Sequence, residues 1–401
     1  MIEVQDALAR LLDAVSPLPP VEVALQDALG RTLAERVVAD RDVPPTDRSA
    51  MDGFAVRAAD CSESLRTLRV IGELRAGQNA ASVVVNAGEA VRAFTGSVIP
   101  EGADAVVMVE RTDEDRAGRT VVVKERAALG QHVRRRGEDL RAGETVREPG
   151  AIVRAAEIAA LAAVGRARVN VVRPPQAALI STGDEIVEAE GCPLPHQVRN
   201  SNASMLLAQF RSMRVDARYL GIAGDEREAL DGLIADGLTA DVLVLTGGVS
   251  VGDYDLVGAA LTRAGCRVLF HNVAMRPGKP ILAAKRGGCL VLGLPGNPVS
   301  AFTGFHVFVQ PALRKLTGDP QPVASPIRAT LIERLDRRPG RLTYHLARLH
   351  WQDGRPVVAP VVNASSGDVL SLVQANAFIV AAGAPDAIPA GAAVDVMPWD
   401  W

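Results

Sequence analysis

The sequence predicts a multidomain α/β protein that contains a doubly wound α/β domain, a helical domain, an inserted β-domain and a C-terminal β-barrel. Between residues 173 and 318, short apolar runs are each followed by a polar glycine-rich loop and a helical pattern, which is typical of a doubly wound sheet. Short β-rich runs separated by Gly and Asn turns fill residues 46–137. Similar runs fill residues 319–401, after a proline-rich linker. The chain therefore combines one α/β domain with two smaller β-rich domains.

Composition places the chain among multidomain proteins of the cytoplasm. It has 401 residues, of which 48% are hydrophobic and only 3% aromatic, so its cores consist mainly of Ala, Val and Leu. The net charge of −3 argues against a general nucleic-acid surface. The four cysteines are scattered without a Cys-x-x-Cys pair, which favours reduced thiols over disulfides or a zinc site. There is no secretory pattern at the N-terminus and no apolar run near the ~20 residues of a membrane helix, so we expect no membrane partner.

The N-terminal part shows the helical period in two stretches, residues 3–16 and 22–38. A third helical stretch, residues 154–164, ends at a glycine suited to stop a helix. If this third helix packs against the first two, residues 1–45 and 138–172 form one helical domain from two segments. The intervening β-rich residues 46–137 would then be an insertion.

The inserted domain begins beside a long polar loop, residues 42–54. Loops of this length are often functional, although an interdomain linker is the alternative. At the other end, the basic stretch His132–Arg136 runs into Glu138 and Asp139. Such a charge run is either a solvated face or a guide for an anionic substrate. The strands expected in this domain are residues 68–71, 82–85, 105–109 and 120–124.

The α/β domain is expected to bind ligands where its strands end, because loops at the carboxyl ends of such strands converge. Its strands are expected at residues 177–180, 218–222, 242–245, 267–270 and 289–292, and its helices at 227–238, 256–264 and 299–317. The C-terminal barrel is expected to use strands at residues 343–349, 357–362, 378–381 and 393–397.

The stretch from Val242 to Asp255 is the most informative part of the chain. A buried strand, Val242–Leu245, leads into a loop with three glycines and closes with two acids. Glycines allow close backbone approach to a ligand, and carboxylate oxygens suit a divalent cation. The carboxylates expected at three strand ends are Asp184, Glu185, Asp225, Asp253 and Asp255. With no Cys or His cluster beside them, they favour Mg²⁺ over zinc, and the nearby Arg276 and Lys279 favour an anionic, phosphorylated ligand.

Several other enzyme classes fit less well. The Walker pattern and the Gly-x-Gly-x-x-Gly pattern are both absent, which argues against an ATPase or a dinucleotide dehydrogenase. The segment Gly248–Gly252 matches the Gly-x-Ser-x-Gly of serine hydrolases, with Ser250 as nucleophile. That motif should lead directly into a helix, whereas acids follow it here, so a hydrolase remains a minor alternative.

Seven motifs, in order along nearly the whole chain, resemble those of the molybdopterin molybdenumtransferases, the MoeA family, which is similar to the gephyrin E domain. They are Pro45–Ala55, Thr95-Gly96, Gly137–Asp139, Ser181–Glu185, Gly247–Gly252, Arg276–Pro280 and Gly293–Ser300. The resemblance implies a homodimer of four-domain subunits with an α/β molybdopterin-binding domain. It also implies Mg²⁺-dependent transfer of molybdenum from molybdate to adenylylated molybdopterin, with release of AMP and molybdenum cofactor. Expected protein partners are the molybdopterin adenylyltransferase and molybdoenzyme maturation factors.

The resemblance also assigns roles to residues. The expected catalytic residues are Asp52, Thr95, Asp139, Glu185, Asp225 and Asp255, and the expected metal ligands among them are Glu185, Asp225 and Asp255. The expected substrate-binding residues are Ser181, Thr182, Gly183, Asp184, Gly247, Gly248, Ser250, Arg276, Lys279, Pro295, Asn297, Pro298 and Arg348. The loop at Asp139 lies outside the α/β domain, so it would reach this site across the dimer, if at all.

The chain departs from the family pattern at two positions. Many relatives carry an aromatic-x-Arg motif in the C-terminal domain, but Leu346 occupies the arginine position here and the nearest arginine is Arg348. The family's Asp-Ser-Asn also begins with Asn200. If the missing arginine binds molybdate, either Arg348 replaces it or insertion is weaker. A divergent paralogue or scaffold that binds molybdopterin without efficient insertion is therefore the alternative, although a scaffold should have lost the strand-end acids that this chain keeps.

Overall fold

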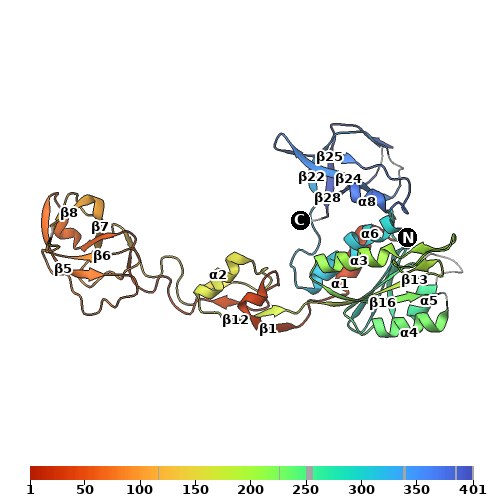
Figure 1. Cartoon of the computed structure of the whole chain (residues 1–401), viewed down its shortest axis with the longest axis horizontal. Helices are drawn as coiled ribbons and strands as arrows, with labels where there is room; N and C mark the ends of the chain where they lie inside the picture. Colours follow the sequence, from red (N-terminus) through yellow and green to blue (C-terminus); the bar gives the residue numbers. More distant parts are fainter. Residues whose placement is uncertain (116, 225, 250–255, 337–339, 384–385, 400–401) are drawn as a thin grey trace.

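The protein is elongated, with a small β-rich lobe at one end and two packed domains at the other (Figure 1). This computed structural model describes residues 1–401 except 116, 225, 250–255, 337–339, 384–385 and 400–401. A narrow middle segment, which carries strands β1 and β12 and helix α2, connects the two ends. The α/β domain and the C-terminal β-barrel lie together beyond it.

The α/β domain is built on a six-stranded sheet in the order β16-β13-β17-β21-β20-β18. Four neighbouring strands are parallel, namely β16 (Asp216–Ala223), β13 (Gln176–Thr182), β17 (Val242–Thr246) and β21 (Cys289–Leu294). β20 (Leu282–Arg286) and β18 (Arg267–His271) complete the sheet in the antiparallel direction. The predicted doubly wound domain is therefore confirmed, with β20 as a strand that the sequence did not predict.

Helices cover both faces of this sheet because each face is apolar. One core joins the sheet to α3 (Ser201–Ser212), α6 (Pro298–Gly304) and α7 (Gln310–Leu316). The opposite core joins it to α4 (Arg227–Gly237) and α5 (Leu256–Arg263). The single helix predicted over residues 299–317 is interrupted by a π-helical turn, Phe305–Val309.

The N-terminal stretches differ from the prediction. Helix α1 (Val4–Asp13) buries Val4, Ala7 and Leu11 in the core of the α/β domain, not in a helical domain. Residues 22–38, predicted as a helix, contain β1 (Pro20–Ala24), the 3₁₀ turn η1 (Leu25–Ala28) and β2 (Val37–Val38). The physical reason is twofold: β1 pairs with a distant strand, and Gly30 has φ +77°, which a right-handed helix cannot contain.

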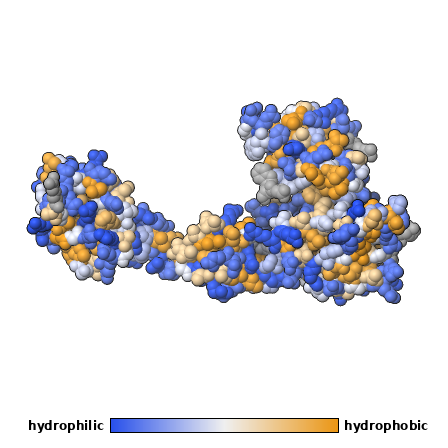
Figure 2. All heavy atoms as spheres, in the orientation of Figure 1, coloured by the Kyte–Doolittle hydropathy of each residue, from blue (hydrophilic) through white to orange (hydrophobic). Residues whose placement is uncertain are grey.

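The middle segment is consequently a mixed structure with α2 (Ala155–Ala163) as its only described α-helix. β1 pairs antiparallel with β12 (Arg168–Val172), and β2 pairs with β11 (Thr145–Arg147). The apolar residues that produced the false helical period, Leu25, Leu33 and Val37, are buried here with Leu161 of α2. Hydropathic colouring shows hydrophobic residues gathered on this segment (Figure 2).

The inserted lobe is a six-stranded sheet in the order β7-β4-β6-β5-β9-β8. Its strands are β4 (Gly53–Val56), β5 (Arg66–Leu74), β6 (Glu89–Ala93), β7 (Ala105–Met108), β8 (Thr112–Glu114) and β9 (Thr120–Val123). The strand predicted at residues 82–85 is wrong, because only an isolated bridge between Val84 and Glu101 forms there. Short strands β3 (Arg48–Ser49) and β10 (Val133–Arg134) pair at the base of the lobe.

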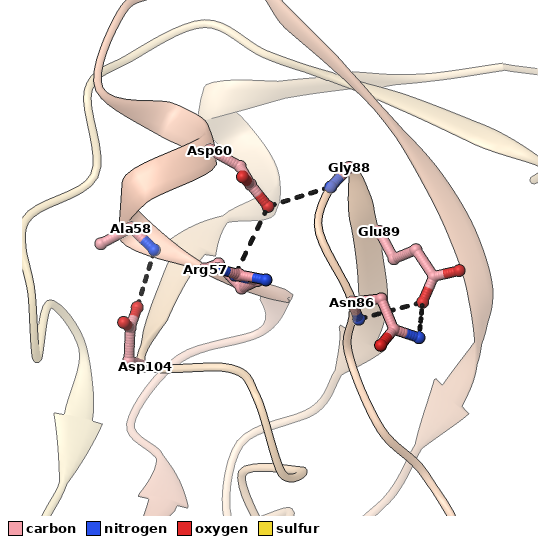
Figure 3. A network of polar contacts seen from close by, with 7 residues as sticks. All are labelled: Arg57, Ala58, Asp60, Asn86, Gly88, Glu89 and Asp104. Atoms are coloured by element: carbon pink, nitrogen blue, oxygen red, sulfur yellow. Dashed lines mark hydrogen bonds and ion pairs between the residues drawn. The ribbon is translucent and has the colours of Figure 1, made fainter.

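Carboxylates fix the loops of this lobe by accepting backbone N–H groups (Figure 3). Asp104 accepts from Ala58 N at 2.7 Å, at the start of the 3₁₀ turn η2 (Ala58–Cys61). Asp60 accepts from Gly88 N at 3.0 Å, and Glu89 accepts from Asn86 N at 3.0 Å. Side chains thus satisfy N–H groups that the sheet leaves unpaired.

The C-terminal domain is a closed five-stranded barrel, as predicted. It contains β22 (Ile327–Leu331), β24 (Leu342–Gln352), β25 (Arg355–Pro360), β26 (Ala377–Ala381) and β28 (Ala393–Pro398), and pairing of β24 with β26 closes it. Strand β19 (Met275–Arg276) of the α/β domain adds to the edge of β24 and joins the two domains. The remaining short elements are β14 (Ile186–Val187), β15 (Val198–Arg199), β23 (Leu335–Asp336), β27 (Ala387–Ile388), η3 (Val109–Arg111) and α8 (Leu370–Gln374). Among the described helices, none has the length and apolar character to span a bilayer.

Candidate active site

A cavity of about 600 Å³ lies where the central strands of the α/β sheet end, which we call the strand-end cavity. It is formed by the loops after β13, β17 and β21 and by the first turn of α3. Its lining includes Ser181, Thr182, Glu185, Asn200, Asn202, Thr246, Gly247, Gly248, Pro295, Asn297 and Pro298. This is the position at which doubly wound sheets bind ligands, as the sequence predicted.

Asn202 and Thr246 tie the loops around this cavity together. The Nδ2 of Asn202 donates to Thr246 Oγ1 at 2.9 Å and to the carbonyl of Gly296 at 2.7 Å. Thr246 Oγ1 donates onward to the carbonyl of Pro295 at 3.2 Å. Both side chains are buried, so these bonds hold α3 and the loops after β17 and β21 in one arrangement. No sequence pattern pointed to Thr246, whereas Asn202 belongs to the Asn-Ser-Asn motif.

The glycines at the end of β17 are required by packing against the neighbouring strand exit. A Cβ on Gly247 would lie 2.4 Å from the carbonyl oxygen of Thr182, and Gly247 has φ +94°. A Cβ on Gly248 would lie 2.8 Å from Thr182 Oγ1. The sequence assigned these glycines to a ligand, but part of the requirement comes from the protein itself.

Asn200 joins the start of α3 to strands β13 and β16 through both polar groups of its side chain. It is 4% exposed and caps α3, with its Oδ1 accepting from Ala203 N at 3.1 Å. Its Nδ2 donates to Ser181 Oγ at 2.9 Å and to the hydroxyl of Tyr219 at 2.8 Å. Burial, reinforced by Glu188, raises the pKa of Tyr219 to about 12. The departure from Asp to Asn at this position therefore suits a buried site that needs hydrogen-bond donors.

Two of the predicted acids lie at the end of β13. Glu185 lines the strand-end cavity. Asp184 lies beside Gly224 at the end of β16, because a Cβ added to Gly224 would lie 2.9 Å from the Oδ1 of Asp184. Gly183, between them and the strand, has φ +131°. Ser250, Asp225 and Asp255 lie outside the described residues. Within the described part of the chain, no group of three or more His, Cys, Asp or Glu side chains is arranged to hold a metal ion.

A second cavity, of about 810 Å³, lies between the α/β domain and the barrel and is called the interdomain cavity. The predicted ligand-binding residues Arg276 and Lys279 line it from the α/β side. Pro280, Pro295 and Asn297 line both cavities, so the two are adjacent. Asn297 Nδ2 donates to Ser366 Oγ at 2.9 Å and thereby links the α/β domain to the barrel.

Arg348 does not line either cavity. On β24, Leu342, Tyr344 and Leu346 pack toward the α/β domain, and Leu346 is only 2% exposed. Arg348 continues the same side of the strand, but it is exposed beyond the contact between the domains. The barrel instead contributes Arg341 to the interdomain cavity, a residue that the sequence did not single out.

The remaining predicted residues lie in and beside the distant lobe. Asp52 Oδ1 accepts from both the N–H and the hydroxyl of Thr95, each at 2.7 Å. The backbone N–H and then the hydroxyl hold the pKa of Asp52 below its usual range. Asp139 forms an ion pair with Arg134 at the base of the lobe. The lobe lies at the opposite end of the molecule from the α/β domain and the barrel, which form the two cavities (Figure 1), so one chain does not bring all predicted residues together.

Comparison with known proteins agrees with this architecture. Residues 2–165 match the model for the MoeA N-terminal region (domain I and II), residues 178–315 a probable molybdopterin binding domain, and residues 328–399 the MoeA C-terminal region (domain IV). The chain therefore belongs to the MoeA family, which confirms the resemblance seen in its motifs.

Relatives and solved structures match over the full length. The molybdopterin molybdenumtransferase of Bacillus subtilis (strain 168) is 36% identical over 415 residues, which cover 100% of this chain and 96% of that protein. The molybdopterin molybdenumtransferase of Staphylococcus aureus (strain Mu50) is 32% identical, covering 99% and 95%. A crystal structure of a molybdopterin biosynthesis MoeA protein from Pyrococcus horikoshii has a TM-score of 0.84 at 29% identity, covering 99% of both chains.

Proposed function

We propose that this chain is a transferase of molybdenum cofactor biosynthesis that moves molybdenum from molybdate to adenylylated molybdopterin and releases AMP. One observation carries the proposal: two cavities of different character adjoin through Pro280, Pro295 and Asn297. The strand-end cavity offers amide and hydroxyl groups and the Glu185 carboxylate, which suit a polar pterin. The interdomain cavity offers Arg276 and Lys279, which suit an oxyanion.

The chemistry requires that charge be stabilised while a phosphoanhydride is cleaved. Arg276 and Lys279 can bind negative charge on molybdate or on the phosphates, because charge-assisted hydrogen bonds are the strong ones. The loops of the strand-end cavity would hold the pterin still, since Asn202 and Thr246 fix them. Molybdate placed in the interdomain cavity would then lie next to the bound pterin.

The carboxylates near the strand ends fit Mg²⁺. Glu185 lines the strand-end cavity, and its described lining residues include no Cys or His. Asp184 lies beside Gly224, which shows that the ends of β13 and β16 meet. Hard oxygen donors of this kind suit Mg²⁺. We propose that Glu185, Asp225 and Asp255 hold it, where it would neutralise phosphate charge.

A homodimer would explain why part of the predicted site lies in a distant lobe. Asp52, Thr95 and Asp139 cannot reach the cavities of their own chain as the lobes are arranged in Figure 1. A second copy could bring its lobe to them. Exposed alanines on α2 offer an apolar surface for such contact: Ala155, Ala156, Ala159, Ala162 and Ala163. The adenylylated substrate would come from a molybdopterin adenylyltransferase in the cytoplasm, and the product would pass to molybdoenzyme maturation factors.

The proposed reaction is tested by loading the purified chain with adenylylated molybdopterin and measuring AMP release, with and without molybdate and Mg²⁺. Release that needs both ions supports the transferase. Glu185→Ala should abolish release while the unfolding transition stays unchanged. Tight pterin binding without molybdate-triggered release would favour the non-inserting paralogue or scaffold instead. Normal release by Glu185→Ala would contradict the site.

Mixing two inactive variants tests the dimer. Asp52→Asn and Glu185→Ala chains, each inactive alone, are unfolded and refolded together. If each site combines both chains, half of the dimers are mixed and hold one intact site, so about a quarter of the activity returns. If each site lies within one chain, no activity returns, because every chain carries a defect.

A further inference from the structure

A third cavity, of about 380 Å³, also lies between the α/β domain and the barrel, and we call it the aromatic cavity. Helices α3, α6 and α8 lie together at this place (Figure 1). Residues of α3 and of the helical run from α6 to α7 line the cavity from the α/β side, and residues of α8 and Trp399 line it from the barrel side. Among the described lining residues, it shares none with the interdomain cavity and only Val369 with the strand-end cavity. It is therefore a separate space from the proposed active site.

Aromatic side chains are concentrated around this cavity. Only 3% of the chain is aromatic, yet Phe302, Phe305 and Trp399 all line this one space. The ring centroids of Phe302 and Trp399 are 4.5 Å apart, and His306 stacks on Trp399 with centroids 6.1 Å apart. The π-helical turn Phe305–Val309 carries part of this cluster, and such turns are frequent at functional sites. A planar ring packs well against aromatic side chains arranged in this way.

Three polar atoms of the residues that line the aromatic cavity are buried without a partner. Two are the carboxamide atoms of Gln209, Oε1 and Nε2, which form no hydrogen bond with a described residue. The third is the indole Nε1 of Trp399, which is unpaired in the same way. Gln310, by contrast, also lines the cavity, and its Oε1 pairs with His306 Nδ1 at 2.9 Å. Because buried polar groups are normally paired, the carboxamide and the indole N–H indicate a missing occupant.

The shape of a carboxamide selects what can pair with it. Its acceptor and its donor lie side by side, so it forms two hydrogen bonds at once with an amide whose C=O and N–H point the same way. A trans peptide bond directs these two groups to opposite sides, and a cis peptide bond without proline is costly. A small ring holds its amide in the cis form without that cost. Gln209 therefore favours a cyclic amide over a protein segment as the occupant.

The number of unpaired atoms narrows the kind of ring further. Gln209 Nε2 and Trp399 Nε1 are two donors, and Gln209 Oε1 is one acceptor. A cyclic imide presents the complementary set, which is one N–H between two carbonyl groups. We propose that the aromatic cavity is a binding site for a planar heterocycle with an imide edge. Gln209 recognises this edge by hydrogen bonds, and Phe302 and Trp399 pack against the ring. None of these residues belongs to the proposed active site, so the inference does not depend on the proposed function.

The test is fluorescence titration of the full chain with lumichrome, a planar dye with an imide edge, comparing Gln209→Leu with Gln374→Leu. Gln374 is the matched control, because it is exposed at the end of α8 and lines none of the three cavities. Loss of the hydrogen bonds to the carboxamide should weaken lumichrome binding by about 10-fold to 100-fold in Gln209→Leu. Gln374→Leu should bind like the unaltered chain.

A modified ligand tests the same contact from the other side. Methylation of the imide nitrogen of lumichrome removes the N–H, so it should weaken binding to the unaltered chain but make little difference to Gln209→Leu. Thermal unfolding shows whether the variant is folded. Since leucine removes a buried carboxamide that lacks partners, Gln209→Leu should unfold at the same temperature as the unaltered chain or at a higher one.

Several outcomes would overturn the inference. One is equal lumichrome affinity in Gln209→Leu and the unaltered chain, and another is equal affinity of the unaltered chain for lumichrome and its methylated form. Displacement of lumichrome by adenylylated molybdopterin would place the dye in the strand-end cavity instead. If the unaltered chain binds the capped peptide acetyl-Leu-Val-Leu-amide but not lumichrome, the cavity receives a protein segment and the imide is wrong.

Discussion

Replacing Gly247 with alanine should show how tightly two strand exits are packed at the strand-end cavity. The new Cβ would lie 2.4 Å from the Thr182 carbonyl oxygen and 2.8 Å from its Oγ1. Real Cβ contacts are essentially never below 3.0 Å, so the backbone must separate by at least 0.6 Å (from 2.4 to 3.0 Å). That movement would disturb the pairing of Ser181 with Thr246, the last pair between β13 and β17.

The cost has two parts. The φ of +94° is unfavourable for alanine, at roughly 1–2 kcal/mol. The clash with a backbone atom adds strain, and together they give a loss of about 2–4 kcal/mol in the free energy of unfolding. For a domain of this size, that lowers the midpoint of thermal unfolding by roughly 4–16 °C.

Gly265→Ala is the matched control for this substitution. Gly265 follows α5, has φ +75°, and its added Cβ would meet no atom within 4 Å. It should lose only the conformational part, about 1–2 kcal/mol. Thermal unfolding of the two variants, followed by circular dichroism, and pterin binding are measured together. Equal losses of stability, or full pterin affinity in Gly247→Ala, would refute the packing argument.

Three further predictions concern other parts of the chain. Arg173 donates two hydrogen bonds to Asp241, each 2.7 Å, and the backbone N–H of Gln176 donates a third at 2.8 Å. Burial alone would raise the pKa of Asp241, but these bonds and the charge of Arg173 outweigh it, so the pKa lies below its usual range. Asp241→Asn should lower the free energy of unfolding by about 1–3 kcal/mol at pH 7. This loss of stability should be complete above the unfolded pKa of about 4 and should vanish as the pH falls through the lower folded pKa. Urea unfolding at several pH values measures it. Asp52→Asn keeps an acceptor for the Thr95 N–H, so it should unfold at the same temperature as the unaltered chain. Its rate of AMP release should fall by about 10-fold or more. An unchanged rate would remove Asp52 from the site. Leu346 lines the interdomain cavity, and Leu346→Ala should cost about 2–4 kcal/mol by enlarging it. The loss should appear as faster proteolysis of the linker before residue 327 than in a surface Leu370→Ala control.

The sequence alone was sufficient for the parallel strands of the α/β domain and for the edge at which their loops meet. Buried parallel strands consist of apolar residues in succession, and each of these runs is followed by a polar loop. The ends of β13, β17 and β21 were therefore predicted to within two residues. The loops that line the strand-end cavity were predicted for the same reason, because the carboxyl ends of parallel strands meet at one edge.

Periodicity alone failed where pairing with a distant segment decided the structure. Residues 22–38 carry apolar side chains at helical spacing, yet β1 pairs with β12, which lies nearly 150 residues further along the chain. β20 was missed although the sequence carries a signal for it: Gly287-Gly288 forms the two-residue turn of a hairpin that pairs Arg286 of β20 with Cys289 of β21. Local propensity cannot report a partner that only the folded chain supplies.

The choice among charged residues also depended on tertiary structure. Arg341 and Arg348 have the same chemistry, but the pairing of β24 with β19 brings the first to a cavity and leaves the second in solvent. Motifs likewise assigned Asp52 and Glu185 to one site, while the elongated fold places the lobe that carries Asp52 and the α/β domain that carries Glu185 at opposite ends of the molecule (Figure 1). Residue type and spacing thus determined which chemistry the protein carries. The three-dimensional arrangement of domains decided where those groups can meet, since that arrangement follows from contacts between segments far apart in sequence.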